Sequence, residues 1–335
     1  MRVGVMDRSD PAECARSGET GGGPLAGDLR TAPPSYGSGP SPGVPLTRPH
    51  RGEADAVART GGPPATVASL VRDLRALGIE EGSTLLVHSS LSSLGWVVGG
   101  AEAAILALEG ALGEAGTLMM PAYSMSFPEP ALWEDPPVPE AWWEVVREEW
   151  PPFDPDFSPA LRLGTIAETF RHQRGTRRSL HPNNSFCARG PNAHKLLDDH
   201  ALDLSMGEGS PLARLYDLDG GILLLGVDHS SNSSYHLAEY RANWPGQRAT
   251  RSFRGRMIRE GATVDCVLQD LDLDSDDFAA LGEDFEKELG LVRTHRVALA
   301  TAHLMRQRAA VDFAVRWIET HRPGIVRDDR SSRVT

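Results

Sequence analysis

One order of elements occurs twice along this chain and constrains its fold most: a short apolar run, a polar loop and then a helical pattern. In the first segment, a strand predicted at residues 84–87 leads through a loop at 88–100 into a helix at 101–112. A second apolar run at 117–120 stops at a proline and predicts another strand. A strand, a helix and a second strand in this order form a βαβ unit with parallel strands.

The second segment repeats this order later in the chain. It predicts a strand at 221–227, a loop at 228–234 and a helix at 235–243, with Ser233 or Ser234 as the N-cap. Alternating strands and helices of this kind place helices on both faces of one sheet. The expected fold is therefore a three-layer α/β/α sandwich.

The folded part is expected to be a single domain at residues 64–325, followed by a short tail at 326–335. Residues 1–63 contain 12 Gly and 9 Pro and show no sustained apolar periodicity, so they cannot bury enough surface to offset the entropy of ordering. We therefore expect a disordered extension there. Within the domain, residues 125–159 are rich in Pro and Trp and are expected to form a lid or wall.

Three further elements are expected in the domain. Apolar residues at helical spacing predict a helix at 66–77, which Gly78 ends. Short alternating runs within 248–278 indicate a hairpin, and an amphipathic helix is predicted at 311–319.

The balance of charge limits the partners of this chain. It has 46 acidic and 34 basic residues and a formal net charge of −12, which disfavours nucleic acid and an anionic membrane surface and suits a cationic ligand. No apolar run is long enough to span a bilayer, and the first ten residues lack the apolar centre of a signal peptide, so a cytoplasmic location is expected. The three cysteines are far apart in the sequence, which argues against a cysteine-based zinc site.

The loop at 88–100 is the first candidate binding site, because ligands of α/β sheets lie beyond the carboxyl ends of the strands. Its serines and its paired glycines, Gly99 and Gly100, can bring backbone N–H donors close to a phosphate. The loop lacks the lysine of a nucleotide-triphosphate loop and the spacing of a dinucleotide fingerprint. A turn without any ligand is the alternative.

His236 and Glu239 lie three residues apart in a predicted helix and therefore on one face of it. A carboxylate beside a histidine fixes the tautomer of the imidazole and stabilises the imidazolium, which suits a general base. A surface ion pair or a core histidine gives the same spacing. His229 and His236 have no third ligand at a recognisable spacing, so no metal is expected.

The acidic run DLDLD at residues 270–274 would project three carboxylates from one face of a strand. Carboxylates so close repel one another unless a cation such as calcium or a polyamine lies between them, and a solvated acidic edge is the alternative. Arg177 and Arg178 supply positive charge for a phosphate, or simply border a surface turn.

Four strings occur in the order in which one family has them: HSSLSSLGWVVGG at 88–100, RRSLHPNNSF at 177–186, GEGSPLARL at 207–215 and ILLLGVDHSSNSSYHLAE at 222–239. Together they resemble the aminoglycoside 3-N-acetyltransferases. The resemblance extends from about residue 66 to about residue 321. It implies an α/β fold and an enzyme that uses acetyl-CoA to acetylate the 3-amino group of the 2-deoxystreptamine ring of aminoglycoside antibiotics, which confers resistance.

The resemblance also implies roles for individual residues. His236 would be the catalytic base and Glu239 the accompanying acid. The residues that would bind the cofactor are His88, Ser89, Ser90, Leu91, Ser92, Gly99, Gly100, Arg178, Ser179 and His181. Those that would bind the antibiotic are Asp272, Asp274, Glu129 and Glu208.

The mechanism that the resemblance implies is direct acetyl transfer to a cationic aminoglycoside. His236 would remove a proton from the acceptor ammonium, and backbone N–H groups would stabilise the oxyanion. Two other readings are open. One is a related enzyme that acetylates a different biosynthetic amine, and the other is a protein that binds coenzyme A or a polyamine without catalysis. The oligomeric state, monomer or homodimer, is open as well.

Overall fold

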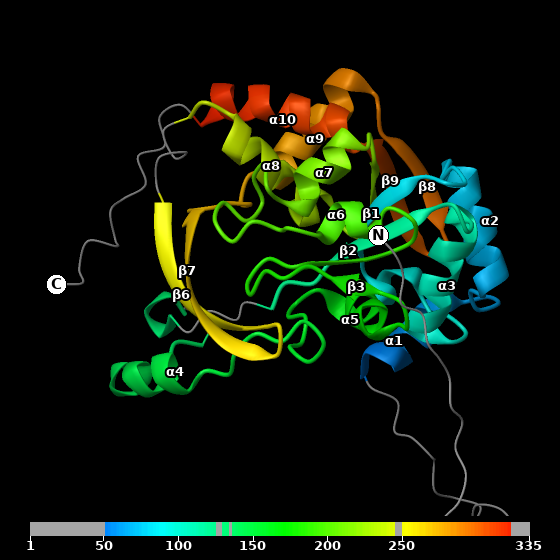
Figure 1. The fold of residues 1–335 in the computed structure, drawn as a ribbon. Coiled ribbons are helices and arrows are strands. Elements are labelled where there is room, and N and C mark those ends of the chain that lie inside the picture. The colour runs from blue at the N-terminus through cyan, green and yellow to red at the C-terminus, as the bar shows by residue number, and fades with distance from the viewer. Residues whose placement is uncertain (1–50, 125–128, 134–135, 245–249, 323–335) are drawn as a thin grey trace, which may run out of the picture. The chain divides into compact units, whose positions relative to one another are not determined.

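The computed structural model describes residues 51–124, 129–133, 136–244 and 250–322. Its main sheet has the strand order β3-β4-β2-β1-β5-β9-β8 (Figure 1). The central strands β1 (Thr84–Ser89), β2 (Thr117–Pro121) and β5 (Gly221–Leu225) run parallel. The outer strands run antiparallel to their neighbours: β3 (Arg177–Arg178), β4 (Phe186–Arg189), β8 (Arg293–Val297) and β9 (Ala300–Arg306).

Strand β1 lies at the centre of the sheet because it is apolar on both faces. Leu85 and Val87 pack into the core on one side and Leu86 into the core on the other, and all three are at most 2% exposed. The three parallel strands run in the same direction, so their carboxyl ends share one edge of the sheet. The loops that follow β1, β2 and β5 therefore meet at that edge.

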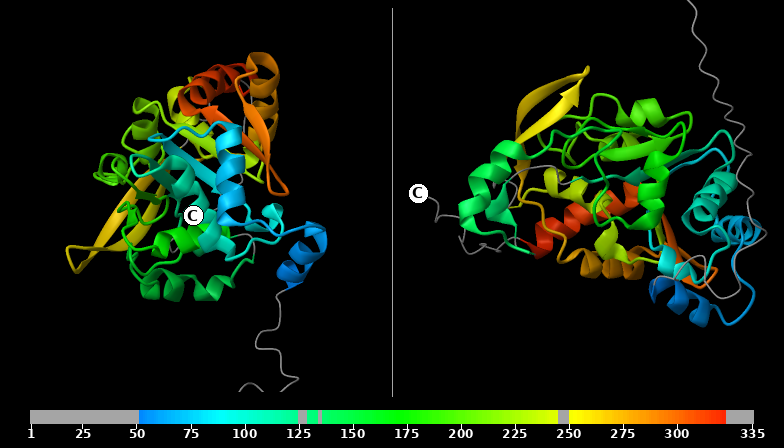
Figure 2. Two further views of the ribbon diagram at one scale, coloured as in Figure 1. Left: turned by 90° about the vertical axis from the view of Figure 1, so that its right-hand side faces the viewer. Right: turned by 90° about the horizontal axis from the view of Figure 1, so that it is seen from below.

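Helices cover both faces of the sheet, which confirms the three-layer prediction (Figure 2). One core is closed by α2 (Val67–Leu77), α3 (Gly100–Leu112) and α5 (Gly164–His172). The helices of the other core are α6 (Ala193–Leu197), α7 (Pro211–Asp217), α8 (Ser234–Arg241), α9 (Phe278–Leu289) and α10 (Gln307–His321). Within the described ranges, no helix is both long enough and apolar enough to cross a bilayer.

Local sequence signals set several element ends. The Thr66 side chain caps α2 and forms a capping box with Ser69, and Gly78 ends the helix with a φ of 108°, as predicted. Strand β5 is shorter than the predicted 221–227, because Gly226 turns the chain with a φ of 71°. The predicted helices at 235–243 and 311–319 correspond to α8 and α10.

The predicted hairpin is also present. It consists of β6 (Thr250–Arg259) and β7 (Ala262–Leu271), which pair antiparallel as a separate two-stranded sheet (Figure 1). In the Trp- and Pro-rich insertion, the described residues form η2 (Pro130–Leu132), η3 (Glu140–Trp142) and α4 (Trp143–Glu149). Phe153 joins this insertion to β6 through a parallel bridge with Met257.

The expectation of a disordered extension was wrong for its last part, because residues 51–60 form helix α1 (Arg51–Thr60). Ala56 is buried, and Thr60 accepts a hydrogen bond from the Trp96 backbone N–H at 2.8 Å. The Arg59 guanidinium donates to the backbone carbonyl of Ser92. These contacts tie α1 to the loop after β1, which supplies the order that the Gly- and Pro-rich composition did not predict. Residues 1–50 lie outside the described residues.

Candidate active site

A cavity of about 1180 Å³ opens at the edge of the sheet where β1, β2 and β5 end. The loops after β1 and β5 and the first turns of α3 and α5 line it. All seven residues predicted for the cofactor in the first loop line this cavity: His88, Ser89, Ser90, Leu91, Ser92, Gly99 and Gly100. The structure therefore brings this part of the predicted site together.

The loop after β1 has a backbone conformation that lets a ligand come close to its main chain. The Ser90 backbone N–H donates to the carbonyl of Leu225 at 3.0 Å, which ties the loop to the end of β5. Gly99 and Gly100 lead into α3 with φ angles of 86° and 55°, which glycine adopts without strain. A Cβ atom on Gly99 would lie 3.2 Å from the Cβ of Ala103. This turn thus leaves the N-terminal end of α3 open to the cavity.

His88, the last but one residue of β1, is 6% exposed and lines the same cavity. Burial, together with the positive charge that His236 can carry, lowers the pKa of His88 to about 3, so His88 is neutral at pH 7. Within the described residues, its Nε2 is buried and has no hydrogen-bond partner. This nitrogen thus has hydrogen-bonding capacity that the protein itself does not use.

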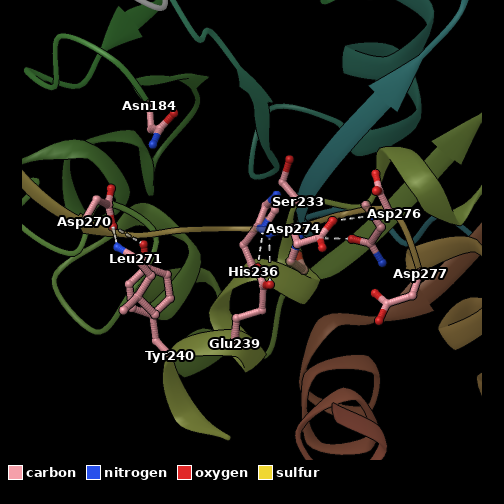
Figure 3. Close-up of polar contacts among 12 residues, drawn as sticks. Asn184, Ser233, His236, Glu239, Tyr240, Asp270, Leu271, Asp274, Asp276 and Asp277 are labelled. Carbon is pink, nitrogen blue, oxygen red and sulfur yellow. Dashed lines mark hydrogen bonds and ion pairs between the residues drawn. The ribbon is translucent and has the colours of Figure 1, made fainter. Parts of the chain in front are cut away.

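His236 and Glu239 come from the first two turns of α8 and point toward one another (Figure 3). His236 Nδ1 lies 2.6 Å from Glu239 Oε2, and the two side chains are 16% and 0% exposed. A carboxylate can only accept, so Nδ1 carries the hydrogen and Nε2 of a neutral His236 is the proton acceptor. His236 also lines the cavity and packs against Phe278 with 4.9 Å between ring centroids.

Sequence reasoning missed the partner on the far side of Glu239. Arg322 Nη1 lies 2.6 Å from Glu239 Oε1, and the backbone N–H of Asp274 donates to the same oxygen at 3.1 Å. The Arg322 guanidinium also forms a two-pronged ion pair with Asp277. Arg322 follows α10, eighty-odd residues from Glu239 in sequence, so no local spacing indicated the contact.

Other residues that line the cavity were missed as well. Arg162, Gly164 and Thr165 surround the start of α5, whose N-terminal end faces the cavity. Tyr123 donates to the Ser233 hydroxyl at 2.6 Å, and both residues line the cavity next to His236. The one sequence signal for the α5 end was a glycine before a helical pattern, which is too common to identify a site.

The predicted cofactor residue Arg178 does not line the cavity. Its guanidinium donates to the carbonyl of Ala122 at 2.6 Å and to the Ser185 hydroxyl at 2.9 Å, and lies 4.9 Å from the ring of Phe153. Burial lowers the pKa of Arg178 to about 10. The Arg178 guanidinium thus donates to backbone carbonyls, and these hydrogen bonds hold the insertion against the sheet.

Ser179 and His181 also lie away from the residues that line the cavity, and both are buried. His181 Nδ1 accepts the backbone N–H groups of Asn183 and Asn184, and its Nε2 lies 3.0 Å from the carbonyl of Leu202. Both ring nitrogens are therefore occupied by the backbone. The Ser179 hydroxyl bonds to His200 Nδ1 at 2.9 Å. Ser179 and His181 thus belong to a buried cluster of polar side chains, and we call residues 177–186, which contain them, the 177–186 knot.

The acidic run does not form one face of a strand, and that prediction was wrong. Strand β7 ends at Leu271, so Asp272 and Asp274 lie beyond it. Asp270 is buried and accepts hydrogen bonds from Tyr240 and Ser205, well apart from Asp274 (Figure 3). In the described part of the chain, no group of three or more His, Cys, Asp or Glu is arranged to hold a metal ion.

The four acids predicted to bind the antibiotic take protein partners instead of lining the cavity. Asp272 pairs with Arg251 at 2.7 Å, and Asp274 accepts the backbone N–H of Asp276 at 2.9 Å. Glu129 pairs with Arg147 at 2.6 Å and Glu208 with Arg241 at 2.7 Å. Their role in binding a substrate stays a prediction.

Comparison with known proteins identifies the family of this chain. The aminoglycoside 3-N-acetyltransferase family matches residues 86–319. The SPbeta prophage-derived aminoglycoside N(3')-acetyltransferase-like protein YokD of Bacillus subtilis is 42% identical over 76% of this chain and 92% of its own length. Aminoglycoside N(3)-acetyltransferase VIII of Streptomyces fradiae is 39% identical over 81% of this chain and 98% of its own.

Solved structures share the fold. The structure of AAC-IIIb with CoASH has a TM-score of 0.70 and 32% identity and covers 79% of this chain and 100% of its own. AAC-VIa bound to sisomicin has a TM-score of 0.69 and 29% identity and covers 78% and 100%. The matched region contains the loop after β1, His236 and Glu239, and the chain therefore belongs to the aminoglycoside 3-N-acetyltransferase family.

Proposed function

We propose that this protein transfers the acetyl group of acetyl-CoA to the 3-amino group of a 2-deoxystreptamine aminoglycoside and thereby confers resistance. The observation that carries the proposal is the pair formed by His236 and the fully buried Glu239 at the wall of the cavity. A protein that only binds coenzyme A would have no need of an oriented base there. The names of the relatives support the choice of acceptor.

The cavity fits acetyl-CoA as the second substrate. It has room for a long, flexible molecule at about 1180 Å³, and the helix ends at Gly100 and Gly164 can receive phosphate groups. The orphaned Nε2 of His88 is a polar atom that a bound thioester group could satisfy. When bound, acetyl-CoA supplies the activated acetyl group. The serines and glycines of the loop after β1 would hold it.

His236 would prepare the acceptor. At neutral pH an aliphatic amine is mostly an ammonium without a free lone pair, so a base must remove one proton before the nitrogen can attack a carbonyl carbon. His236 Nε2 takes that proton at the wall of the cavity. Glu239 stabilises the resulting imidazolium through the bond at Nδ1, and backbone N–H groups of the loop after β1 offer donors for the acetyl oxygen.

The acceptor is proposed to be polycationic. The formal net charge of −12 favours approach of such a ligand, and Asp272, Asp274, Glu129 and Glu208 are its proposed contacts. Replacing Asp272 and Asp274 by Asn should mainly raise the KM of the aminoglycoside. A change in cofactor affinity alone would contradict this assignment. None of the described residues of the insertion lines the cavity, so the structure gives no particular support to a slimmer amine.

Release of the coenzyme A thiol tests the proposal. Purified protein is supplied with acetyl-CoA and either a panel of 2-deoxystreptamine aminoglycosides or a panel of small biosynthetic amines, and NMR identifies the acetylated nitrogen. We expect turnover on the aminoglycosides, strongly reduced in His236→Gln and retained in His295→Gln, a matched change at an exposed histidine of β8. Turnover on other amines alone would overturn the choice of acceptor. Cofactor binding without any turnover would favour a binding protein.

Two predictions from the sequence belong to this proposal. The reaction is placed in the cytoplasm, and a homodimer is compatible with it. Fractionation of the native host and sedimentation of the purified protein measure these two properties directly.

A further inference from the structure

Arg322 has the lowest exposure, 2%, of the buried arginines among the described residues, and its guanidinium contacts the surroundings of Glu239. It bonds to Glu239 Oε1 at 2.6 Å and to the backbone carbonyl of Asp274 at 3.0 Å, and it pairs with both oxygens of Asp277. Its guanidinium carbon lies 5.1 Å from the ring of Trp244. A side chain held from so many directions has one available position.

Glu239 depends on this arrangement. Its side chain is 0% exposed, so water does not solvate the carboxylate. One oxygen bonds to His236 Nδ1, and the other receives Arg322 and the backbone N–H of Asp274. Arg322 is the one full positive charge among these partners. A buried carboxylate without such a charge takes up a proton or destabilises the fold.

The charges around the His236–Glu239 pair are mostly negative. Asp274, Asp276 and Asp277 belong to the segment between β7 and α9, which lies beside the pair (Figure 3). His88 of β1 also lies close enough for the charge of His236 to act on it, and it is neutral at pH 7. Without a cation, these carboxylates would favour a proton on the pair, and a pair that already holds that proton cannot act as a base.

We propose that Arg322 is a positioning residue of the proposed reaction, because it holds Glu239 ionised and directed at His236 so that the pair accepts a proton at neutral pH. The inference rests on the proposed function for its catalytic meaning. Burial lowers the pKa of Arg322, but the hydrogen bonds that it donates to Asp277 and Glu239 outweigh burial and raise the pKa overall, so the guanidinium keeps its charge. Asp277 holds the guanidinium from the side opposite Glu239.

The pH dependence of kcat/KM tests this role. Replacing Arg322 by Met removes the cation, so the pair binds a proton more readily and the acidic limb of the profile should move up by about one pH unit or more. At a pH on the acidic limb, a shift of one unit lowers kcat/KM by up to about tenfold, with the Kd of coenzyme A unchanged. Arg322→Lys keeps the charge but cannot reproduce the contacts with Glu239 and Asp277 together, so its limb should lie between those of the parent and Arg322→Met. Arg316→Met, a change at an exposed position of α10, the helix that Arg322 follows, is the matched control.

Asp277→Asn gives a second test with the opposite sign. Removing this carboxylate leaves the whole charge of Arg322 to Glu239, so the acidic limb should move to lower pH. The Asp277 side chain is 29% exposed, so this variant is expected to fold even where Arg322→Met does not. Limbs that coincide with the parent in both variants would overturn the proposal, as would Arg322→Lys behaving like Arg322→Met.

Nitrogen NMR of the His236 imidazole provides a readout that needs no substrate. The midpoint of its titration should rise in Arg322→Met and fall in Asp277→Asn relative to Arg316→Met. Absence of acetyl transfer in the parent protein would contradict the proposed function while leaving this titration to decide the role of Arg322. An unchanged midpoint in both variants would contradict that role whatever the activity.

Discussion

Two motifs of this chain have nearly the same residue types but differ in the hydrogen bonds that their histidines form. The segment from Asp228 to Glu239 and the 177–186 knot each contain histidine, serine and asparagine next to a strand of the main sheet. His236 lines the cavity and bonds to Glu239 through Nδ1, whereas His181 has both ring nitrogens bonded to the backbone. The first motif has the arrangement that the proposed proton transfer requires, and the second holds loops together.

The difference shows that residue type indicates chemistry only where hydrogen-bonding capacity is left over. Both nitrogens of the His181 imidazole form hydrogen bonds: Nδ1 with backbone N–H groups of its own loop and Nε2 with the carbonyl of Leu202. The Nδ1 atom of His236 bonds to Glu239, which orients the imidazole, and within the described residues its Nε2 atom forms no hydrogen bond. A histidine with both nitrogens satisfied in the interior stabilises the fold, and a histidine with one satisfied nitrogen at a cavity can move a proton.

The largest effect expected is on turnover in His236→Gln. Loss of the proposed base should lower kcat about a thousandfold, because general bases contribute typically ~10²–10⁴. The melting temperature and the Kd of coenzyme A should change little, because the side chain is at the cavity wall. Steady-state kinetics and calorimetry check both parts. Parent-like turnover would remove His236 as the base.

The converse change, His181→Ala, should act on stability. It leaves two backbone N–H groups and the carbonyl of Leu202 without their partner in the interior, so the free energy of unfolding should fall by about 2–3 kcal/mol. Turnover per folded molecule should stay within about threefold of the parent. Denaturant unfolding and active-site titration measure these quantities. A large fall in kcat of the folded variant would contradict the difference in role between the two motifs.

Acid should destabilise the protein through two buried histidines, His88 at the cavity and His200, which bonds to Ser179 of the 177–186 knot. Burial lowers the pKa of His88 and of His200 to about 3, so below the ordinary value of 6.5 the unfolded chain binds protons that the folded chain does not. Stability therefore falls as the pH drops below about 6.5, by about 2 kcal/mol for each group at pH 5. Melting temperatures between pH 8 and pH 5 should follow this slope, and His200→Gln should reduce it. The same slope in both proteins would refute the assignment to His200.

The smallest effect expected is in Ser179→Ala, which bears on the predicted cofactor role of the knot. The hydroxyl bonds to His200 and accepts the backbone N–H of Phe186, so its loss should cost about 1 kcal/mol of stability. The Kd of coenzyme A, measured by calorimetry, should not change. A Kd raised several-fold would return the 177–186 knot to the cofactor site.

Much of the fold could be predicted because its signals are local. Apolar runs and helical spacing predicted β1, β2, β5, α2 and α3 close to their observed ends, since capping residues and glycines act over one or two turns. The pair His236 and Glu239 could be predicted for the same reason. Strand β7 ended earlier than the alternation suggested, because alternation of residue types continues past the point where backbone pairing stops.

The sequence by itself determined the alternation of strands and helices, the loop of serines and glycines after β1, and the helix face that carries His236 and Glu239. The tertiary structure decided which histidine nitrogens form hydrogen bonds within the protein. It also decided that Arg178 donates to backbone carbonyls and that Arg322 bonds to Glu239. It also decided that α1 packs against the loop after β1. The physical reason is range: propensity and periodicity act between near neighbours in sequence, whereas burial and hydrogen-bond saturation depend on contacts between residues far apart in it.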